Sequence, residues 1–134
     1  MKKFLVYIAL TVTCIVLFSG CRKKGAGIEQ SLEITNSLNG FTYRIDVMHR
    51  GGNENELVFF VLDSDNLLPF IDKQMKNIET AQKITFVGIA YQGKDKRQRD
   101  YTPTKNGGES GRAGEFLDFI TTGLDSTLMA EGIY

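Results

Sequence analysis

Two apolar segments, LVFFVL at residues 57–62 and KITFVGIAY at residues 83–91, decide the fold of this chain. Neither alternates apolar with polar side chains as a half-exposed strand does, so both are predicted to be central strands, covered on both faces and with parallel neighbours. Between them, apolar residues recur at helical spacing, at Leu68, Ile71, Met75 and Ile78. Strand, helix and strand make one βαβ unit, for which a right-handed crossover is the default. The segment therefore predicts an α/β domain.

The start of the predicted helix has its own signals. Asp65 or Asn66 can cap the amide groups of the first turn. Pro69 is tolerated in that turn, because its missing N–H has no partner to lose there. We therefore expect a helix of about ten residues after the first buried strand.

A hairpin is predicted upstream of this unit. Residues 28–34 and 41–48 alternate apolar with polar side chains, which is typical of strands with one solvent-exposed face. Asn39 and Gly40 between them form a common hairpin turn. The sequence RGGNENE at residues 50–56 is too polar to be buried and is predicted to be a loop.

Downstream, residues 92–112 form a polar segment without regular periodicity, and we expect a long loop there. A final helix is suggested by the spacing of its apolar residues, Phe116, Leu117, Ile120 and Leu124. Gly123 is expected to interrupt it, because glycine is a poor helix former.

The amino terminus has the pattern of a bacterial lipoprotein signal. Two lysines precede sixteen uncharged residues, and the run ends on small residues followed by Cys21. Residues 1–20 are thus expected to be a signal peptide, residues 21–27 a tether and residues 28–134 the domain, with a lipid on Cys21 as the contact with the bilayer. A plain secretory signal or membrane anchor, with Cys21 incidental, is the alternative. The expected location is the bacterial cell envelope, on the periplasmic or surface side.

Charge and cysteine content argue against nucleic-acid binding, disulfide bonds and cysteine-based metal sites. Residues 1–20 carry two of the 16 basic residues and none of the 16 acidic ones, so the remainder, 14 basic against 16 acidic, has a formal charge of −2. A nearly neutral domain of this kind is not expected to bind nucleic acid. With Cys14 inside the signal segment, no disulfide or cysteine-based metal site is available to the rest of the chain.

Three blocks together resemble a known family: VFFVLDSDNLLPF at 58–70, TFVGIAYQGKDKRQRDYTPT at 85–104 and GEFLDFI at 114–120. They are similar to the esterase family of the α/β-hydrolase superfamily that includes siderophore esterases and esterase-D-like proteins. The Arg-Asp-Tyr-Thr-Pro loop at residues 99–103 is the most specific match, and Ser64 stands where the family usually has glycine. The resemblance implies the amino-terminal part of an α/β-hydrolase fold, with an antiparallel hairpin followed by a mostly parallel sheet.

The same resemblance implies an oxyanion site. Hydrolases of this fold stabilise the tetrahedral oxyanion with a backbone N–H from the loop after the third strand, here Ser64 or Asp65. The basic loop would face an ester substrate, and its candidate residues are Arg97, Arg99, Asp100 and Tyr101. Arg97 or Arg99 would contact an acidic substrate or tie the loop to Asp63. No cofactor or metal is expected.

No catalytic residue is assigned. Around Ser110 the sequence GESGR departs from G-x-S-x-G and lacks a preceding buried strand, so Ser110 is not expected to be the nucleophile. His49 is the single histidine and ends the second strand, whereas the family's histidine comes last. The resemblance thus implies a fragment that is inactive alone.

Two other functions remain open. An apolar strand followed by Asp63 and Asp65 also resembles the first motif of haloacid-dehalogenase-type phosphatases, in which one aspartate attacks phosphorus and the other acts as acid and base. Leu67, where those enzymes usually have threonine, departs from the motif. The second possibility is a lipid-anchored binding or structural module without catalysis, which would use a sheet edge left exposed after the fourth strand.

Overall fold

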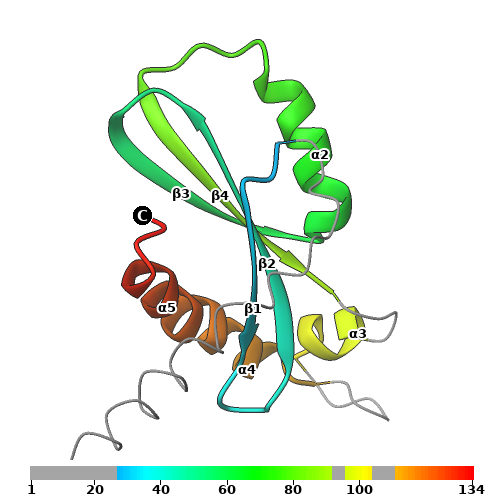
Figure 1. The fold of residues 1–134 in the computed structure, drawn as a ribbon. Coiled ribbons are helices and arrows are strands. Elements are labelled where there is room, and N and C mark those ends of the chain that lie inside the picture. Colours follow the sequence, from blue (N-terminus) through cyan, green and yellow to red (C-terminus); the bar gives the residue numbers. More distant parts are fainter. Residues whose placement is uncertain (1–26, 92–95, 104–110) are drawn as a thin grey trace, which may run out of the picture.

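A four-stranded mixed sheet forms the centre of the fold in the computed structural model, which describes residues 27–91, 96–103 and 111–134 (Figure 1). The strands lie in the order β1-β2-β4-β3, with bounds β1 (Gln30–Thr35), β2 (Thr42–Gly51), β3 (Glu54–Leu62) and β4 (Gln82–Ala90). β2 is antiparallel to β1 and to β4, whereas β3 and β4 are parallel and joined by helix α2 (Ser64–Met75). The predicted hairpin, βαβ unit and α/β class are confirmed.

Helices cover both faces of the sheet. α2 lies on one face over a core of Met48, Val61, Leu68 and Phe86. The other face is covered by three consecutive helical segments: α4 (Ala113–Asp118), the π-helical η1 (Phe119–Leu124) and α5 (Asp125–Ala130). The prediction of one solvent-exposed face on β2 is therefore wrong. Asp46 and Met48, on the face expected to be exposed, are buried because α2 packs over them.

β3 lies at an edge of the sheet and not at its centre, contrary to the prediction. β4 inserts between β2 and β3, so the edges of the sheet are β1 and β3 and the exposed edge does not follow the fourth strand. Leu57 and Phe59 are consequently 39% and 48% exposed, although Phe59 stacks on Phe86 of β4. β3 has the apolar composition of a strand buried inside a sheet. Among the described residues, however, nothing covers Leu57 and Phe59 completely.

The predicted loop at residues 50–56 is mostly strand. β2 continues to Gly51 and β3 begins at Glu54, so only residues 52 and 53 make the turn. Gly51 has a φ of 85°, and a Cβ there would lie 2.2 Å from the backbone oxygen of Gln82. Gly52 has as little space for a side chain, because a Cβ there would lie 2.4 Å from the backbone oxygen of Ala81. The two glycines permit a tight turn beside β4. The polar residues on either side of the turn can therefore belong to β2 and β3.

α2 begins earlier than its capping signals indicated. Its N-cap residue is Asp63, which makes no side-chain cap, and neither Asp65 nor Asn66 caps it because both lie inside the first turn. Pro69 lies within the helix, beyond the first turn, and Ile78 lies past its end with 52% exposure.

Two further corrections concern the carboxyl-terminal third. The expected loop contains a short helix, α3 (Lys96–Tyr101), which tertiary contacts hold in place. The final helix is not interrupted at Gly123, because the chain passes through it in the π-helical turns of η1 and continues into α5.

The expected signal peptide and Cys21 lie outside the described residues. Within the described ranges, no helix is both long enough and apolar enough to cross a bilayer.

Candidate functional site

The candidate site is the turn from β3 into α2. Asp63 has φ 55° and ψ 45°, the left-handed conformation, and is the one non-glycine residue with positive φ in the described part of the chain. Aspartate tolerates this region better than most residues do. The unusual backbone therefore falls on Asp63, and Ser64, where the resembled family has glycine, starts α2 without a positive φ.

Ser64 is fixed by a buried polar network beneath the turn. Its side chain is fully buried, and its hydroxyl donates a hydrogen bond of 3.0 Å to Oδ2 of Asp46 on β2. Asp46 also accepts from Ser31 Oγ at 2.6 Å and from Arg44 Nη2 at 3.0 Å. Gly88 of β4 makes room for the serine, since a Cβ at that position would lie 2.5 Å from Ser64 Cβ.

These contacts leave two amides at the head of α2 in a defined position. The first four N–H groups of a helix have no partner within it and carry a partial positive charge. The Asp63 carbonyl accepts the amides of Asn66 and Leu67, at 3.0 and 3.1 Å. The Ser64 and Asp65 amides remain as the first donors of a twelve-residue helix, an arrangement suited to an anion or a developing oxyanion.

The carboxylates of the turn are paired with arginines. Asp63 Oδ2 lies 2.6 Å from Arg97 Nη2, so the tie predicted between the basic loop and Asp63 is made by Arg97. Arg97 is also 5.9 Å from the ring of Tyr101, and its side chain is 57% exposed. Asp65 pairs with Arg44. Each aspartate of the phosphatase-like motif thus faces a cation of the protein.

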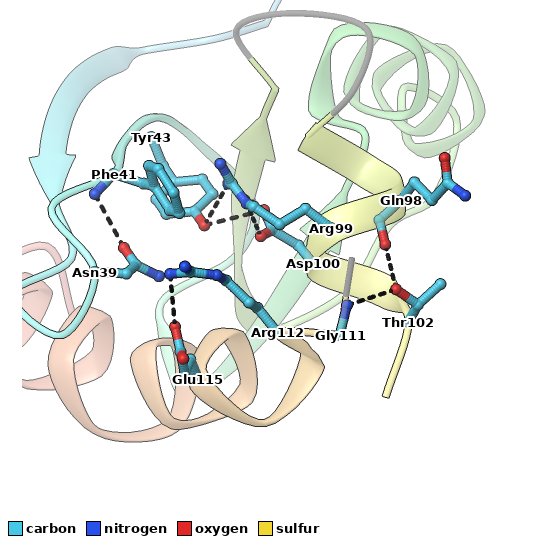
Figure 2. Close-up of polar contacts among 10 residues, drawn as sticks. All are labelled: Asn39, Phe41, Tyr43, Gln98, Arg99, Asp100, Thr102, Gly111, Arg112 and Glu115. Carbon is cyan, nitrogen blue, oxygen red and sulfur yellow. Dashed lines mark hydrogen bonds and ion pairs between the residues drawn. The ribbon is translucent and has the colours of Figure 1, made fainter. Parts of the chain in front are cut away.

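Arg99 and Asp100 are placed differently from Arg97 (Figure 2). Both are almost fully buried, and Arg99 donates to Asp100 from Nε at 2.6 Å and from Nη2 at 2.9 Å. The Tyr43 hydroxyl accepts from Arg99 Nη2 at 3.1 Å and donates to Asp100 Oδ2 at 3.0 Å. Burial, reinforced by the Asp100 charge, raises the pKa of Tyr43 above its usual range. The guanidinium also lies 3.6 Å from the ring centroid of Phe41. This cluster anchors α3 to β2.

The residues around α3 complete that anchorage. Thr102 Oγ1 donates to the Gln98 carbonyl at 2.6 Å and accepts from the Gly111 amide at 3.0 Å (Figure 2). The Arg112 amide donates to the Arg99 carbonyl at 3.1 Å. Residues 102 and 111 are therefore held close together.

Tyr101 and Tyr91 line the buried side of α3. Their rings meet edge to face with centroids 5.5 Å apart, and burial raises the pKa of both hydroxyl groups. Each hydroxyl is buried without a hydrogen-bond partner among the described residues.

Two other residues considered from the sequence are not brought to this site. Ser110 lies outside the described residues. His49 pairs in register with Thr85 near the start of β4, whereas the Asp63 turn follows the carboxyl end of β3. Its Nδ1 lies 2.7 Å from Thr85 Oγ1, which donates to Glu56 at 2.5 Å.

The residues that hold Ser64 in place were not predicted from the sequence. Asp46, Ser31 and Gly88 look like ordinary strand residues, and Asp46 in an alternating strand indicates a solvent-exposed face. Asp46 is buried only because α2 packs over the face of the sheet on which this side chain lies. The one available signal was Gly88 inside an apolar strand, which indicates close approach by another segment.

Comparisons with known proteins support the fold and leave the activity open. No known family profile matches the chain, and no curated protein matches it. Among solved structures it is similar to the one described as BES protein from Bacillus cereus, with 18% sequence identity and a TM-score of 0.66. The match covers 82% of this chain and 48% of the other, so this chain spans about half the length of that protein. At this identity the two share a fold, an α/β domain with a mixed sheet.

Proposed function

We propose that this chain provides the oxyanion half of a carboxylic-ester hydrolase domain of the α/β-hydrolase type, tethered to a bilayer through Cys21. The observation that carries the proposal is the left-handed turn at Asp63, after which Ser64 and Asp65 are the first two residues of α2. An ester substrate would place its carbonyl oxygen against these amides, whose hydrogen bonds strengthen as charge develops on that oxygen.

The basic loop supports this assignment. Residues 99–101 of the Arg-Asp-Tyr-Thr-Pro sequence form the end of α3, and Arg97, two residues earlier, contacts Asp63 directly. Arg97 is an exposed cation that contacts the turn at Asp63, so we assign it the contact with an acidic group of the substrate. Arg99 and Asp100 hold α3 in place.

The nucleophile and the catalytic histidine would come from outside residues 1–134. The uncovered edge of β3 supports this, because an apolar strand at an edge is suited to receive a further parallel strand. The match covers only 48% of the structurally similar protein, which is compatible with such an addition.

Titration of the 15N-labelled full chain with methylphosphonate tests the oxyanion site. The anion should shift the backbone amide resonances of Ser64 and Asp65 downfield and saturably, as hydrogen bonding to an anion does. Asp46→Asn, which loosens Ser64, should weaken the shift, and Glu115→Gln in α4, on the other face of the sheet from α2, should not. The absence of a saturable shift at these two amides would overturn the assignment.

A second test concerns the nucleophile and the catalytic histidine. The full chain should not hydrolyse p-nitrophenyl acetate above the buffer rate, and activity should appear when it is joined to a segment, encoded downstream, that supplies a strand and a G-x-S-x-G elbow. Hydrolysis by the chain alone that disappears in Ser110→Ala would contradict the proposal. So would a joined protein that folds but is inactive.

The lipid anchor is tested separately. Expressed in bacteria with radioactive palmitate, the chain should incorporate label and sediment with membranes, and Cys21→Ala should do neither. Labelling that persists in Cys21→Ala would place the lipid elsewhere.

The exposed edge of β3 also favours the second candidate function, a binding module without catalysis. Such a module would show a cooperative thermal transition as a monomer and no activity in the joined protein. A molten or insoluble chain would favour the esterase fragment.

A further inference from the structure

The exposed apolar side chains of this protein gather on the α2 side of the sheet. Among the described residues, five of the eight large apolar side chains that are exposed lie on β3, on α2 or just past its end: Leu57, Phe59, Leu67, Phe70 and Ile78. Phe59 stacks on Phe86, which belongs to the core under α2, so β3 contributes to the same side. Apolar exposure concentrated in one place is typical of an interaction surface.

The exposed part of α2 combines apolar residues with lysines. The side chains that this helix buries are those of Ser64, Leu68 and Asp72. With 3.6 residues per turn, its exposed side carries four residues spaced three apart, which we call the α2 surface: Leu67, Phe70, Lys73 and Lys76. Phe70 is 59% exposed and the Lys76 side chain 62%. Phenylalanine and leucine next to lysines are typical of helices that lie in a membrane interface.

The acidic residues of α2 do not cancel the charge of these lysines. Asp65 pairs with Arg44, and the buried Asp72 pairs with Arg50, so both carboxylates face cations of β2. Asp72 also lies 3.6 Å from Lys76 Nζ, but that lysine remains mostly exposed. The α2 surface is therefore apolar at one end and positively charged at the other.

The described chain begins beside this helix. The Gly27 carbonyl accepts a hydrogen bond of 3.4 Å from Arg50 Nη2, and a Cβ on Gly27 would lie 2.7 Å from Cγ of Asp72 (Figure 1). Residues 22–26 separate Gly27 from Cys21. The Cα atoms of these two residues are therefore at most about 22 Å apart, since an extended chain spans at most about 3.6 Å per residue. A lipid on Cys21 would keep α2 close to the bilayer, whereas α4, η1 and α5 cover the opposite face of the sheet.

We propose that the α2 surface rests on the membrane that holds Cys21, an inference that depends on the lipid anchor of the proposed function. Leu67 and Phe70 enter the boundary between headgroups and acyl chains, and Lys73 and Lys76 contact anionic phospholipid headgroups. Because the anchor makes this contact intramolecular, a weak affinity is enough to hold the domain against the bilayer.

Tryptophan quenching in vesicles tests this orientation. The chain contains no tryptophan, so Phe70→Trp introduces a single reporter. The lipidated full chain is reconstituted in vesicles of phosphatidylethanolamine and phosphatidylglycerol that include a phospholipid brominated on its acyl chains. The emission of Phe70→Trp should shift to shorter wavelength, and bromine should quench most of it. Leu117→Trp is the matched control, because Leu117 is 60% exposed on α4, and its emission should be unchanged.

Two results of this experiment would overturn the proposal: equal quenching of both reporters, or an unquenched Phe70→Trp in a chain that sediments with the vesicles. A protein partner or a second copy on the α2 surface would give the second result. If Phe70→Trp fails to fold, Leu67→Trp replaces it, since Leu67 is 43% exposed. Palmitate labelling reports the anchor separately. A labelled but unquenched chain overturns the orientation alone, whereas an unlabelled chain overturns the anchor and this inference with it.

The lysines are tested in the Phe70→Trp background. Lys73→Gln should lower the ratio of docked to undocked chains about fivefold, the contribution of one basic residue near an anionic surface. Lys83→Gln is the matched control, because Lys83 pairs with Glu56 and lies on β4 instead of α2, and it should leave the ratio unchanged. An unchanged ratio in Lys73→Gln, or an equal fall in both variants, would contradict the proposal.

Discussion

Asp46 links the sheet to the candidate site. Its buried carboxylate accepts hydrogen bonds from Ser31, Arg44 and Ser64, and so connects β1, β2 and the first residue of α2. Buried carboxylates are tolerated only with such partners. The position of the two candidate oxyanion amides thus depends on a residue that makes no contact with substrate in the proposed function.

Replacing Asp46 by asparagine should therefore destabilise the protein. The amide nitrogen cannot accept from donors that now point at it, and we expect the free energy of unfolding to fall by about 2–3 kcal/mol. Asp65→Asn is the matched control, because Asp65 pairs with the same arginine on the surface and should cost less than about 1 kcal/mol. Urea denaturation measures both. Equal losses would mean that the Asp46 network carries no special stability.

Among the elements, α2 and α3 are held against the sheet in different ways. α2 approaches β4 closely enough that a Cβ at Gly88 would lie 2.5 Å from both Leu68 Cδ1 and Ser64 Cβ. α3 has only six residues and depends on the buried Arg99 and Asp100. Side chains of α2 pack directly on Gly88 of β4 and so position that helix. A buried ion pair between Arg99 and Asp100 positions α3.

Gly88→Ala should push α2 away from the sheet. The added methyl group has no room, and overpacking of this kind costs about 1–3 kcal/mol. Gly114→Ala in α4 is the control, since a Cβ there meets nothing within 4 Å and alanine favours the helix by up to about 1 kcal/mol. Thermal unfolding should show the two melting temperatures moving in opposite directions. A neutral Gly88→Ala would show that α2 can shift without cost.

The two arginines of α3 should differ sharply on replacement by alanine. Arg99→Ala strands Asp100 in the core and should cost about 3–5 kcal/mol, whereas Arg97→Ala removes an exposed pair and should cost less than about 1 kcal/mol. Hydrogen exchange of the α3 amides should accelerate strongly only in Arg99→Ala. A large loss of stability in Arg97→Ala would instead make the Asp63 contact structural.

At the scale of the whole molecule, the sheet ends on an apolar strand. β3 pairs with β4 on one side only, and Phe59 is 48% exposed. Natural proteins usually protect such edges with charge, proline or a covering segment. The described residues provide acidic side chains at the start of β3 and none in its apolar half.

Phe59→Lys should therefore reduce self-association of the full chain. A lysine on the exposed edge opposes strand addition by a second molecule. Leu117→Lys on α4 is the control, because Leu117 is also exposed, at 60%, but lies away from the edge. Sedimentation velocity should show a smaller associated fraction for Phe59→Lys alone. Equal effects of the two lysines would point to general solubility rather than to the edge.

The sequence by itself determined the elements that local chemistry specifies. Alternation at residues 41–48 indicated the hairpin, and two apolar runs around a 3.6-residue period indicated the βαβ unit, because side-chain periodicity follows from backbone geometry. The same local reasoning predicted a helix after residues 57–62, although it placed the cap at Asp65 or Asn66 and not at Asp63. The link between the basic loop and Asp63 came from the family resemblance.

Only the tertiary structure decided the order of the strands and the faces that are buried. β4 lies between β2 and β3 because parallel pairing across a helical crossover selects its neighbour, and no local pattern encodes that choice. For the same reason Asp46 faces inward, Arg99 is buried and α3 forms in a segment without periodicity. These features depend on contacts between residues far apart in the chain, whereas a sequence pattern reports neighbours a few residues away.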